Sequence, residues 1–420
     1  MVEISEVDVH DDGLLREYWD VEQAAQRADC THPVLRSYDR LVQLARQPAP
    51  GHHRTLLAAY DGPGLVGVAE LSGSTADNLH LAEVEVDVLP SHRRRGIGRA
   101  LLAEVLRRGR AEGRRTFIGE ACRPTSEQPS DAISFAQASG FEPAHREDHL
   151  VLDLPASPAA VAGSPDSGHT ILTWVNRAPD DLVTAYARMR TQMNHDVPIG
   201  DLDREPAAVT VEQIRAGEDR LSHHYDTVVG VARRPDGELG GYTLAFLPHG
   251  EDYVQQDDTF VAREARGQGV GRSLKTAVLR MLAAERPERA RVHTWTDPDN
   301  DPMQRLNRAL GFRPVELMLE MQLEVASASP LAGGPGMEAG VVDRTDHHGQ
   351  QRATDERAVT RLAGVEVAAV AGGGRTQHEP DDQQDEQEAL HRTPPSRPVT
   401  WPDSRGSRPV LAWNATNPAP

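Results

Sequence analysis

Two stretches of this chain share one pattern, in which a strand runs through a glycine-rich turn into a helix. The first is VEVDVLPSHRRRGIGRALLAEVL (Val84–Leu106), and the second is DDTFVAREARGQGVGRSLKTAVL (Asp257–Leu279). Both contain Arg-x-x-Gly-x-Gly, at Arg93, Gly96 and Gly98 and at Arg266, Gly269 and Gly271. The same offset separates all three matching positions, which indicates that a whole domain is repeated.

The glycine-rich turns predict an anion site. Glycine lets the backbone turn tightly and come close to a ligand. The helix that follows begins with unpaired N–H groups and the positive end of its dipole, where phosphate commonly binds. A tight turn without a ligand is the alternative, and two copies flanked by arginine disfavour it. The spacing fits neither the phosphate loop of nucleotide hydrolases nor the dinucleotide fingerprint.

Length and composition restrict the class of protein. A chain of 420 residues is long enough for two or three domains, and its net charge of −19 argues against nucleic-acid binding. Cys30 and Cys122 are the only cysteines and form no Cys-x-x-Cys, which argues against a disulfide framework or a cysteine-based zinc site. We expect no metal, because the histidine pairs lack Cys or carboxylate partners at ligand spacing. No secretory signal or spanning apolar run is found, so we expect a cytoplasmic protein without a membrane partner. The sequence leaves the oligomeric state open.

The predicted order of elements also occurs twice. A strand, two helices, a hairpin, a strand, the glycine loop with its helix, and a closing strand, helix and strand fill residues 1–155 and again 170–325. Between them, 156–169 is rich in Pro, Ser and Gly, which is typical of a linker. Residues 326–420 lack sustained apolar periodicity, and we expect a disordered tail.

This order resembles the GNAT superfamily of N-acetyltransferases over roughly residues 1–325. The matching segments in the first half are Val88-Leu89-Pro90, Arg93-x-x-Gly96-x-Gly98 and DAISFAQASGF (Asp131–Phe141). Those in the second half are Val261, Arg266-x-x-Gly269-x-Gly271, Asn300, Met303, Asn307 and Leu310-Gly311-Phe312. The second half is most similar to tandem actinobacterial members. The resemblance implies an α/β fold with two tandem GNAT domains, each a mixed, mainly antiparallel central sheet flanked by helices.

The resemblance further implies acetyl-CoA as the acetyl donor. Its pyrophosphate would bind the backbone N–H groups of both loops, and the strand ends would splay to offer an N–H to the thioester carbonyl. The implied cofactor-binding residues are Val88, Arg93, Arg94, Arg95, Gly96, Ile97, Gly98 and Arg99 in the first half, and Val261, Arg266, Gly267, Gln268, Gly269, Val270, Gly271, Arg272 and Asn300 in the second.

Direct attack by an amine requires a base to take the amine proton. Glu83, Glu85 and Asp87 alternate with apolar residues, so these three carboxylates share one face of their strand. Asp257 and Asp258 occupy similar positions in the second half. We take Glu83 and Asp258 as the first candidates, and a solvated strand carboxylate is the alternative for each.

One departure from the family concerns the proton donor to the leaving thiolate. Many members carry a tyrosine at the positions that are Ala136 and Asn307 here. A thiol with a pKa near ~8.5 leaves tolerably without help, and water or Tyr253 remains as a donor.

We therefore expect an acetyl-CoA-dependent N-acetyltransferase that acts on a primary amine of a small molecule or peptide. The alternatives are a non-catalytic acetyl-CoA-binding or sensor protein, and a chain with one active and one degenerate half. The sequence leans slightly to an active second half, because that half has Asn300 and a loop at 195–206 suited to an acceptor pocket.

Overall fold

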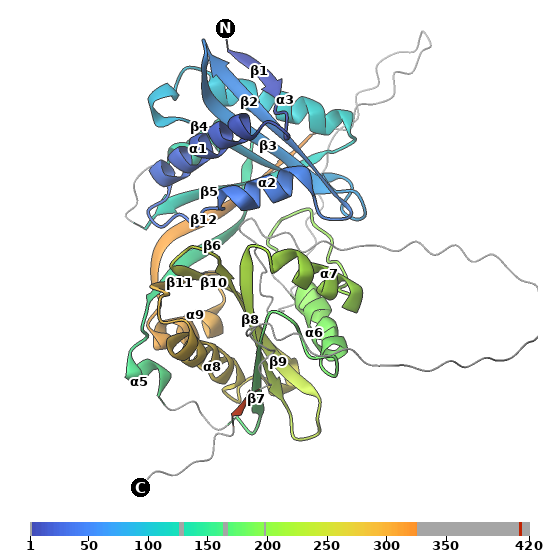
Figure 1. The fold of residues 1–420 in the computed structure, drawn as a ribbon, viewed down its shortest axis with the longest axis vertical. Helices are drawn as coiled ribbons and strands as arrows, with labels where there is room; N and C mark the ends of the chain where they lie inside the picture. The colour runs from blue at the N-terminus through green and yellow to red at the C-terminus, as the bar shows by residue number, and fades with distance from the viewer. Residues whose placement is uncertain (1, 126–129, 163–166, 197–198, 326–410, 414–420) are drawn as a thin grey trace, which may run out of the picture.

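The computed structural model describes residues 2–125, 130–162, 167–196, 199–325 and 411–413 (Figure 1). The tail predicted at 326–420 lies outside this part of the chain, apart from 411–413. The elements of the first half are β1 (Glu3–Glu6), α1 (Asp12–Asp29), α2 (Tyr38–Arg46), β2 (His52–Asp61), β3 (Gly64–Ser74), β4 (Leu81–Val88), η1 (Pro90–His92), α3 (Ile97–Ala111), β5 (Thr116–Pro124), α4 (Asp131–Ala138) and β6 (Glu142–Asp153).

The second half repeats this order after a short helix, α5 (Pro158–Val161). Its elements are β7 (Thr170–Val175), α6 (Val183–Asp196), α7 (Val211–Leu221), β8 (Tyr225–Arg233), β9 (Leu239–Pro248), β10 (Tyr253–Val261), η2 (Arg263–Ala265), α8 (Val270–Glu285), β11 (Arg291–Thr296), α9 (Asp301–Leu310) and β12 (Arg313–Glu324), followed by β13 (Leu411–Trp413). The repeat predicted from the two glycine loops is therefore a repeat of the whole domain.

Helices cover both faces of the sheet in the first half. Successive side chains of a strand point to opposite faces. On β2, Leu56 and Ala58 therefore pack with α1 and α2, whereas Leu57 and Ala59 pack with α3. This sandwich places the glycine loop, which joins β4 to α3, at the edge where the strand ends.

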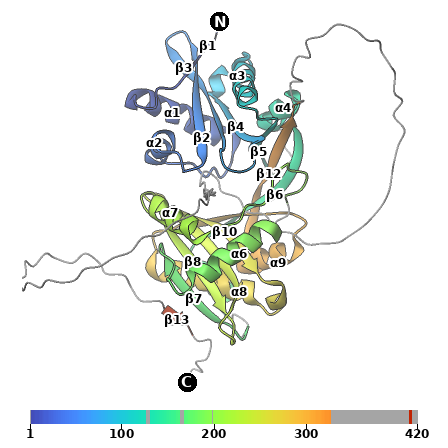
Figure 2. The same ribbon diagram turned by 90° about the vertical axis from the view of Figure 1, so that its right-hand side faces the viewer.

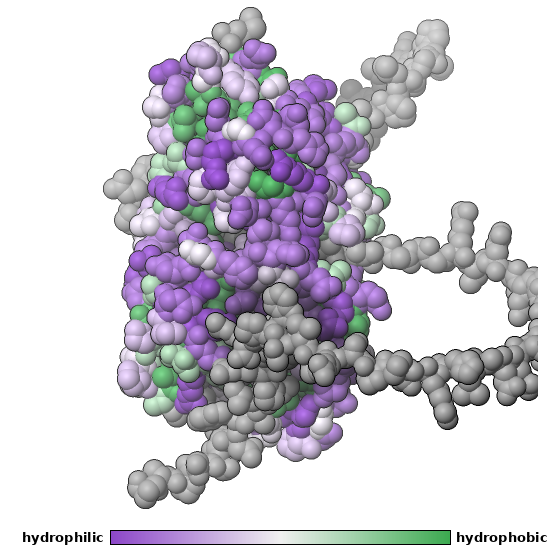
Figure 3. All heavy atoms as spheres, in the orientation of Figure 1, coloured by the Kyte–Doolittle hydropathy of each residue, from purple (hydrophilic) through white to green (hydrophobic). Residues whose placement is uncertain are grey.

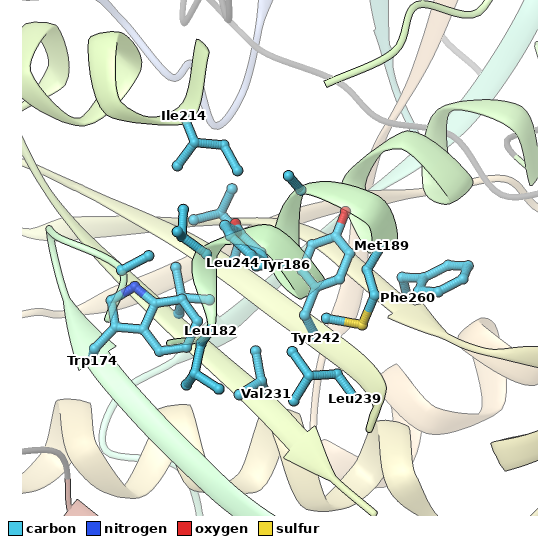
Figure 4. Packing of buried hydrophobic residues seen from close by; sticks show 14 of the residues in the cluster. Trp174, Leu182, Tyr186, Met189, Ile214, Val231, Leu239, Tyr242, Leu244 and Phe260 are labelled. Carbon is cyan, nitrogen blue, oxygen red and sulfur yellow. The ribbon is translucent and has the colours of Figure 1, made fainter. Parts of the chain in front are cut away.

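The second half has the same layers. Tyr186 of α6 and Ile214 of α7 pack with Val231 and Leu244 of the central strands (Figure 4). Val278 of α8 lies in a separate apolar cluster on the other face. The second glycine loop, between β10 and α8, thus occupies the position that the first loop has in the first half.

The two halves exchange their last strands. The described strands form one sheet in the order β1-β2-β3-β4-β5-β12-β6-β11-β10-β9-β8-β7-β13. Strand β12, from the end of the second half, pairs with β5 of the first, and β6, from the first half, pairs with β11 of the second. Figures 1 and 2 show these two strands linking the halves. The sheet is mixed and mainly antiparallel, as the resemblance implied, since β4–β5 and β10–β11 are the only parallel pairs among the described strands.

The predicted linker contributes to the second half. Helix α5 lies beside α8 and α9 (Figure 1), and Leu154 and Val161 pack against the apolar cluster that contains Leu310. Strand β13, which the sequence did not predict, pairs with β7 at the far edge of the sheet. The linker residues around α5 are thus part of the packed structure.

The surface is mainly hydrophilic on the face shown in Figure 3, in keeping with the net charge of −19. Among the described residues, Leu79 is the large apolar side chain that is most exposed, at 56%. No helix in the described ranges is long and apolar enough to cross a membrane.

Candidate active site

The two glycine loops have the same backbone. A 3₁₀ turn precedes each loop, and Gly96 and Gly269 adopt positive φ angles of 85° and 78° directly before the helix. Two residues earlier, Arg94 and Gly267 also have positive φ, at 64° and 76°. A non-glycine residue pays about 1–2 kcal/mol for this conformation, so Arg94 is an unusual choice at its position.

The N-termini of α3 and α8 are left without a side-chain cap. Helices α1, α4 and α9 are capped by Asp11, Ser130 and Asn300, whose side chains accept backbone N–H groups. No side chain among the described residues does this for α3 or α8. The unpaired N–H groups at these helix starts are therefore the donors that an anion requires. Asn300, predicted to bind the cofactor, serves as the cap of α9.

The first arginine of each motif holds a helix end. Arg93 donates from Nε to the carbonyl of Val88 at 3.1 Å and pairs in bidentate fashion with Asp29, at 2.6 and 2.9 Å. Arg266 donates from Nε to the carbonyl of Val261 at 3.0 Å and from Nη2 to Asp196 at 3.2 Å. Asp29 and Asp196 end α1 and α6. We call these contacts the helix clamps; they join the strand end to the helix and occupy the guanidinium groups.

The remaining predicted loop residues differ between the halves. Arg94 and Arg99 are exposed and line the cavity described below. Arg95 donates to the carbonyl of Ser91, and Gln268 donates to that of Glu264. Ile97 and Val270 are buried in the apolar clusters, and Arg272 donates to the carbonyl of Ala160 in the linker at 3.1 Å.

Both strands that precede the loops splay from their parallel neighbours. Strand β4 pairs with β5 only over Leu81–Glu83, and β10 pairs with β11 only over Tyr253–Gln255. The N–H of Leu89 bonds the carbonyl of Val66 on β3, and that of Ala262 bonds the carbonyl of Gly240 on β9. Since backbone N–H groups alternate along a strand, those of Val88 and Val261 face the splayed side. This is the geometry expected for a thioester carbonyl site.

A cavity of about 1220 Å³ extends from the first glycine loop across the splayed strands. One end is formed by the loop and α4, including Gly98, Phe135 and Ala136. The other end lies over the carboxylates of β4 and reaches Arg204 and His195 of the second half. Figure 2 shows the region where the two halves meet beside β12 and β6. The cavity therefore joins a donor site in the first half to walls from both halves.

Three carboxylates meet in this cavity. Oxygen atoms of Glu22, Glu85 and Asp87 lie within 4.8 Å of one another. Burial raises the pKa of Asp87 well above its usual value, and Glu22 and Glu85 raise it further. Glu22 forms an ion pair with Arg36 at 2.7 Å, and Arg36 also pairs with Glu70 at 2.9 Å. The sequence did not single out Glu22, because it lies within an ordinary amphipathic helix pattern.

Glu83 is the last residue of β4 that pairs with β5, and its side chain has a partner from the other half. Its Oε1 accepts from Arg204 at 2.7 Å, and about half of its side chain is exposed. The loop that carries Arg204 is fixed to the first half: Asp203 accepts from Thr116 at 2.8 Å, and Glu205 donates its N–H to Asn78 at 2.7 Å. The predicted acceptor loop of the second half thus forms a wall of the first-half cavity.

Asp258 is enclosed in the second half. Its side chain is fully buried, accepts from the Tyr242 hydroxyl at 2.6 Å and pairs with Arg190 at 3.3 Å. A register shift in β10 between Gln256 and Thr259 contains Asp258 and its neighbour. Asp257 has a pKa raised well above its usual value by burial and by the charge of Asp258. The sequence could not distinguish this buried ion pair from an accessible base.

A buried polar link joins α8 to α9 in the second half. Lys275 is 2% exposed and donates to Asn307 at 2.8 Å, and Asn307 donates to Thr296 at 3.0 Å. We call these three residues the Lys275 bridge. Two arginines of α8 also bind the linker. Arg280 donates to the carbonyl of Val161 at 2.6 Å, and Arg272 donates to the carbonyl of Ala160. In the first half, Leu102 and Ala136 take the positions of Lys275 and Asn307. Both residues are apolar and line the cavity.

The two cysteines are joined at the cavity wall. Cys30, at the C-terminus of α1, forms a disulfide with Cys122 of β5. Composition argued against a framework of several disulfides, and it gave no reason to pair residues 92 positions apart. Beside the disulfide, Glu316 accepts from the N–H groups of Thr31 and His32 and from Nδ1 of His149. These contacts tie the end of α1 to the exchanged strands.

Comparisons with known proteins agree with this geometry. The sequence model of the Acetyltransferase (GNAT) family matches residues 15–141 and 198–312. A mycothiol acetyltransferase of Nocardia farcinica is 30% identical over 308 residues, which are 70% of this chain and 89% of that protein. One from Thermomonospora curvata is 31% identical over 293 residues, which are 69% and 87% of the two chains.

A solved structure shows the same tandem arrangement. It is a tandem GNAT protein from the clavulanic acid biosynthesis pathway, with 25% identity and a TM-score of 0.66, and the match covers 78% of this chain and all of that one. The family match in each half and the relatives that match across both halves lead to one conclusion. This chain belongs to the GNAT family of acetyltransferases and is a tandem N-acetyltransferase.

Proposed function

We propose that the first half transfers the acetyl group of acetyl-CoA to a primary amine of a small molecule or peptide, by direct attack. The observation that carries this proposal is the cavity that joins the first glycine loop to the carboxylates of β4. The second half serves as a scaffold that supplies part of the cavity wall. This assignment replaces the slight preference for the second half that the sequence suggested.

The residues of the first loop fit acetyl-CoA. The uncapped start of α3 offers backbone N–H groups to the pyrophosphate, and Arg94 and Arg99 add positive charge beside it. A Cβ on Gly98 would lie in ordinary contact with Phe135, at 3.4 Å, and with Val88, at 3.6 Å, and glycine leaves this space beside the strand end unfilled. The N–H of Val88 is placed to donate to the thioester oxygen, on which negative charge develops.

The base assigned here is Asp87. A carboxyl with a raised pKa takes a proton more readily near neutral pH than an ordinary aspartate does. Glu22 and Glu85 surround it and attract the protonated amine before attack. Asp87 takes one proton from the bound ammonium group, and the neutral amine nitrogen then forms the new C–N bond. The second proton on this nitrogen is lost to water, and the C–S bond breaks to release the thiolate of CoA. Glu83, the earlier candidate, is engaged by Arg204 and shapes the wall.

A dedicated proton donor is not required for the leaving group. Ala136 stands at the family's tyrosine position and lines the cavity, so it leaves room for water there. CoA leaves as a thiolate, and a thiol with a pKa near ~8.5 is an adequate leaving group. The rate should therefore depend on Asp87 more than on any hydroxyl group.

The contacts between α8 and α9 support one working site in each chain. The Lys275 bridge joins these helices at positions that are apolar and line the cavity in the first half, and the linker helix α5 lies beside both helices. A chain in which both halves bind acetyl-CoA without transfer, as a sensor, is the competing function. It predicts two ligands per chain and no acetylated product.

Calorimetric titration of acetyl-CoA with the full chain tests the proposal. We expect one site, abolished by Gly96→Glu and retained in the matched Gly269→Glu variant. Asp87→Asn should keep the affinity and lower kcat by about 10²-fold or more with an amine acceptor, whereas Glu83→Gln should change kcat less. Loss of binding in Gly269→Glu alone would move the reaction to the second half. Binding without turnover on any amine would favour the sensor.

A further inference from the structure

The disulfide joins two parts of the donor site that the sequence separates widely. Cys30 and Cys122 are the only cysteines among the 420 residues, and both line the cavity. Cys30 follows Asp29, the residue that holds Arg93 in the first helix clamp. Cys122 lies on β5, the strand that splays from β4. The disulfide therefore fixes the clamp of the glycine loop to the opposite side of the splayed strands.

The disulfide is also accessible from the cavity. Cys30 is half-buried, whereas Cys122 is 4% exposed and lies beneath it. A small thiol that enters the cavity therefore reaches Cys30 first. The proposed reaction itself releases such a thiol, because free CoA is its product.

We propose that Cys30 and Cys122 form a reversible thiol–disulfide site through which small thiols control acetyl-CoA binding in the first half. This inference rests on the function proposed above. A thiolate attacks the sulfur of Cys30, the bond to Cys122 breaks, and a mixed disulfide forms. A second thiol releases Cys30, so two small thiols are oxidised to one disulfide while the cysteine pair gains two electrons and two protons.

The surroundings of Cys122 suit its reduced form. The carbonyl of Asp29 lies 3.5 Å from its sulfur and accepts the S–H that reduction creates. The Glu316 carboxylate, within 4.8 Å, disfavours a negative thiolate at this position. Both contacts favour a protonated thiol, which does not attack Cys30 again until it loses its proton. The reduced state thus has defined partners in the fold.

Reduction removes the covalent link between the end of α1 and β5. The backbone from Cys30 to Arg36 forms the cavity wall and carries the Arg36 guanidinium that binds Glu22 and Glu70. Without the disulfide, the end of α1 is held by non-covalent contacts, among them the ion pair of Asp29 with Arg93 and the bonds of Glu316 to the N–H groups of Thr31 and His32. We expect a looser clamp and weaker acetyl-CoA binding, with no change in the second half.

The test compares oxidised and reduced forms of the full chain. Thiols are counted with a chromogenic disulfide reagent, and acetyl-CoA affinity is measured by calorimetry before and after dithiothreitol. We expect no free thiol before reduction and two after it, with a Kd for acetyl-CoA that rises on the order of fivefold. Incubation with free CoA in place of dithiothreitol should give a chain whose mass increases by one CoA.

A Cys30→Ser/Cys122→Ser variant provides the matched control. It should bind acetyl-CoA like the reduced chain, with or without dithiothreitol. Equal affinity in both redox states would overturn the inference and leave the proposed function standing. Two titratable thiols that do not pair under a mild oxidant would overturn it as well. Absence of acetyl-CoA binding in either state would instead reject the proposed function, and this inference with it.

Discussion

Asp258 and Asp87 lie on corresponding strands, β10 and β4, but their surroundings differ. Asp258 is fully buried against Arg190 and the Tyr242 hydroxyl, whereas Asp87 faces a cavity. Removing one partner of a buried ion pair leaves the other charge unsatisfied. We expect Asp258→Asn to lower the free energy of unfolding by about 3–5 kcal/mol in chemical denaturation. The matched control is Asp180→Asn, which removes an exposed pair with Arg215 and should change stability by less than about 1 kcal/mol.

Lys275, buried in the second half, makes stability depend on pH. Burial lowers its pKa to about 7 from the ordinary value of 10.5. Between these values the unfolded chain binds the proton and the folded chain does not, so stability rises with pH in this window. The slope from this group is at most about 1.4 kcal/mol per pH unit. Urea unfolding at pH 7 and pH 9 should show this rise in the native chain and not in Lys275→Met. Equal slopes in both would show that Lys275 keeps its charge in the fold.

At the scale of elements, substitutions can separate the contribution of the helix clamp, made by Arg93, from that of Arg94 in the glycine loop. Arg93 joins α1 to the end of β4, whereas Arg94 is exposed beside the helix start. We expect Arg93→Ala to lower thermal stability and to weaken acetyl-CoA binding indirectly. Arg94→Ala should leave the melting temperature nearly unchanged and weaken binding by about tenfold, as loss of a charged phosphate contact does. If Arg94→Ala binds acetyl-CoA normally, the loop holds its ligand through backbone groups alone.

The sequence predicts the elements well where a local pattern determines them. Glycine spacing locates both strand–loop–helix units, and the alternation of Glu83, Glu85 and Asp87 with apolar residues places these carboxylates on one face. The same patterns do not reveal partners that come from distant segments. From the sequence, Arg93 is a candidate phosphate ligand, but in the structure it pairs with Asp29. Asp258 is likewise a candidate base, but in the structure it pairs with Arg190. Tertiary contacts therefore determine which candidate side chains remain available for chemistry.

At the scale of the whole molecule, the strand exchange had no signal in the sequence. Each half ends in a strand that follows a Gly-Phe pair, and no local pattern in either strand indicates which sheet edge it joins. The exchange is fixed by specific side chains: Glu316 of β12 accepts from His149 of β6, whose Nε2 bonds His293 of β11 at 2.9 Å. Burial lowers the pKa of His293 to about 3, which keeps this ring neutral. A buried polar network of this kind favours one register of strands because any shift leaves its members unpaired.

The exchange predicts that neither half folds alone. A fragment of residues 1–157 lacks β12, which pairs with β5 over Thr116–Pro124, and it exposes that strand edge. A fragment of residues 158–325 lacks β6, the neighbour of β11. We expect each fragment to be unfolded or aggregated by circular dichroism and size-exclusion chromatography, and the two co-expressed fragments to form one complex that binds acetyl-CoA like the intact chain. A folded, acetyl-CoA-binding first fragment would show that β6 can return to β5. The first half would then be an independent domain, and the wall that the second half contributes would serve the acceptor alone.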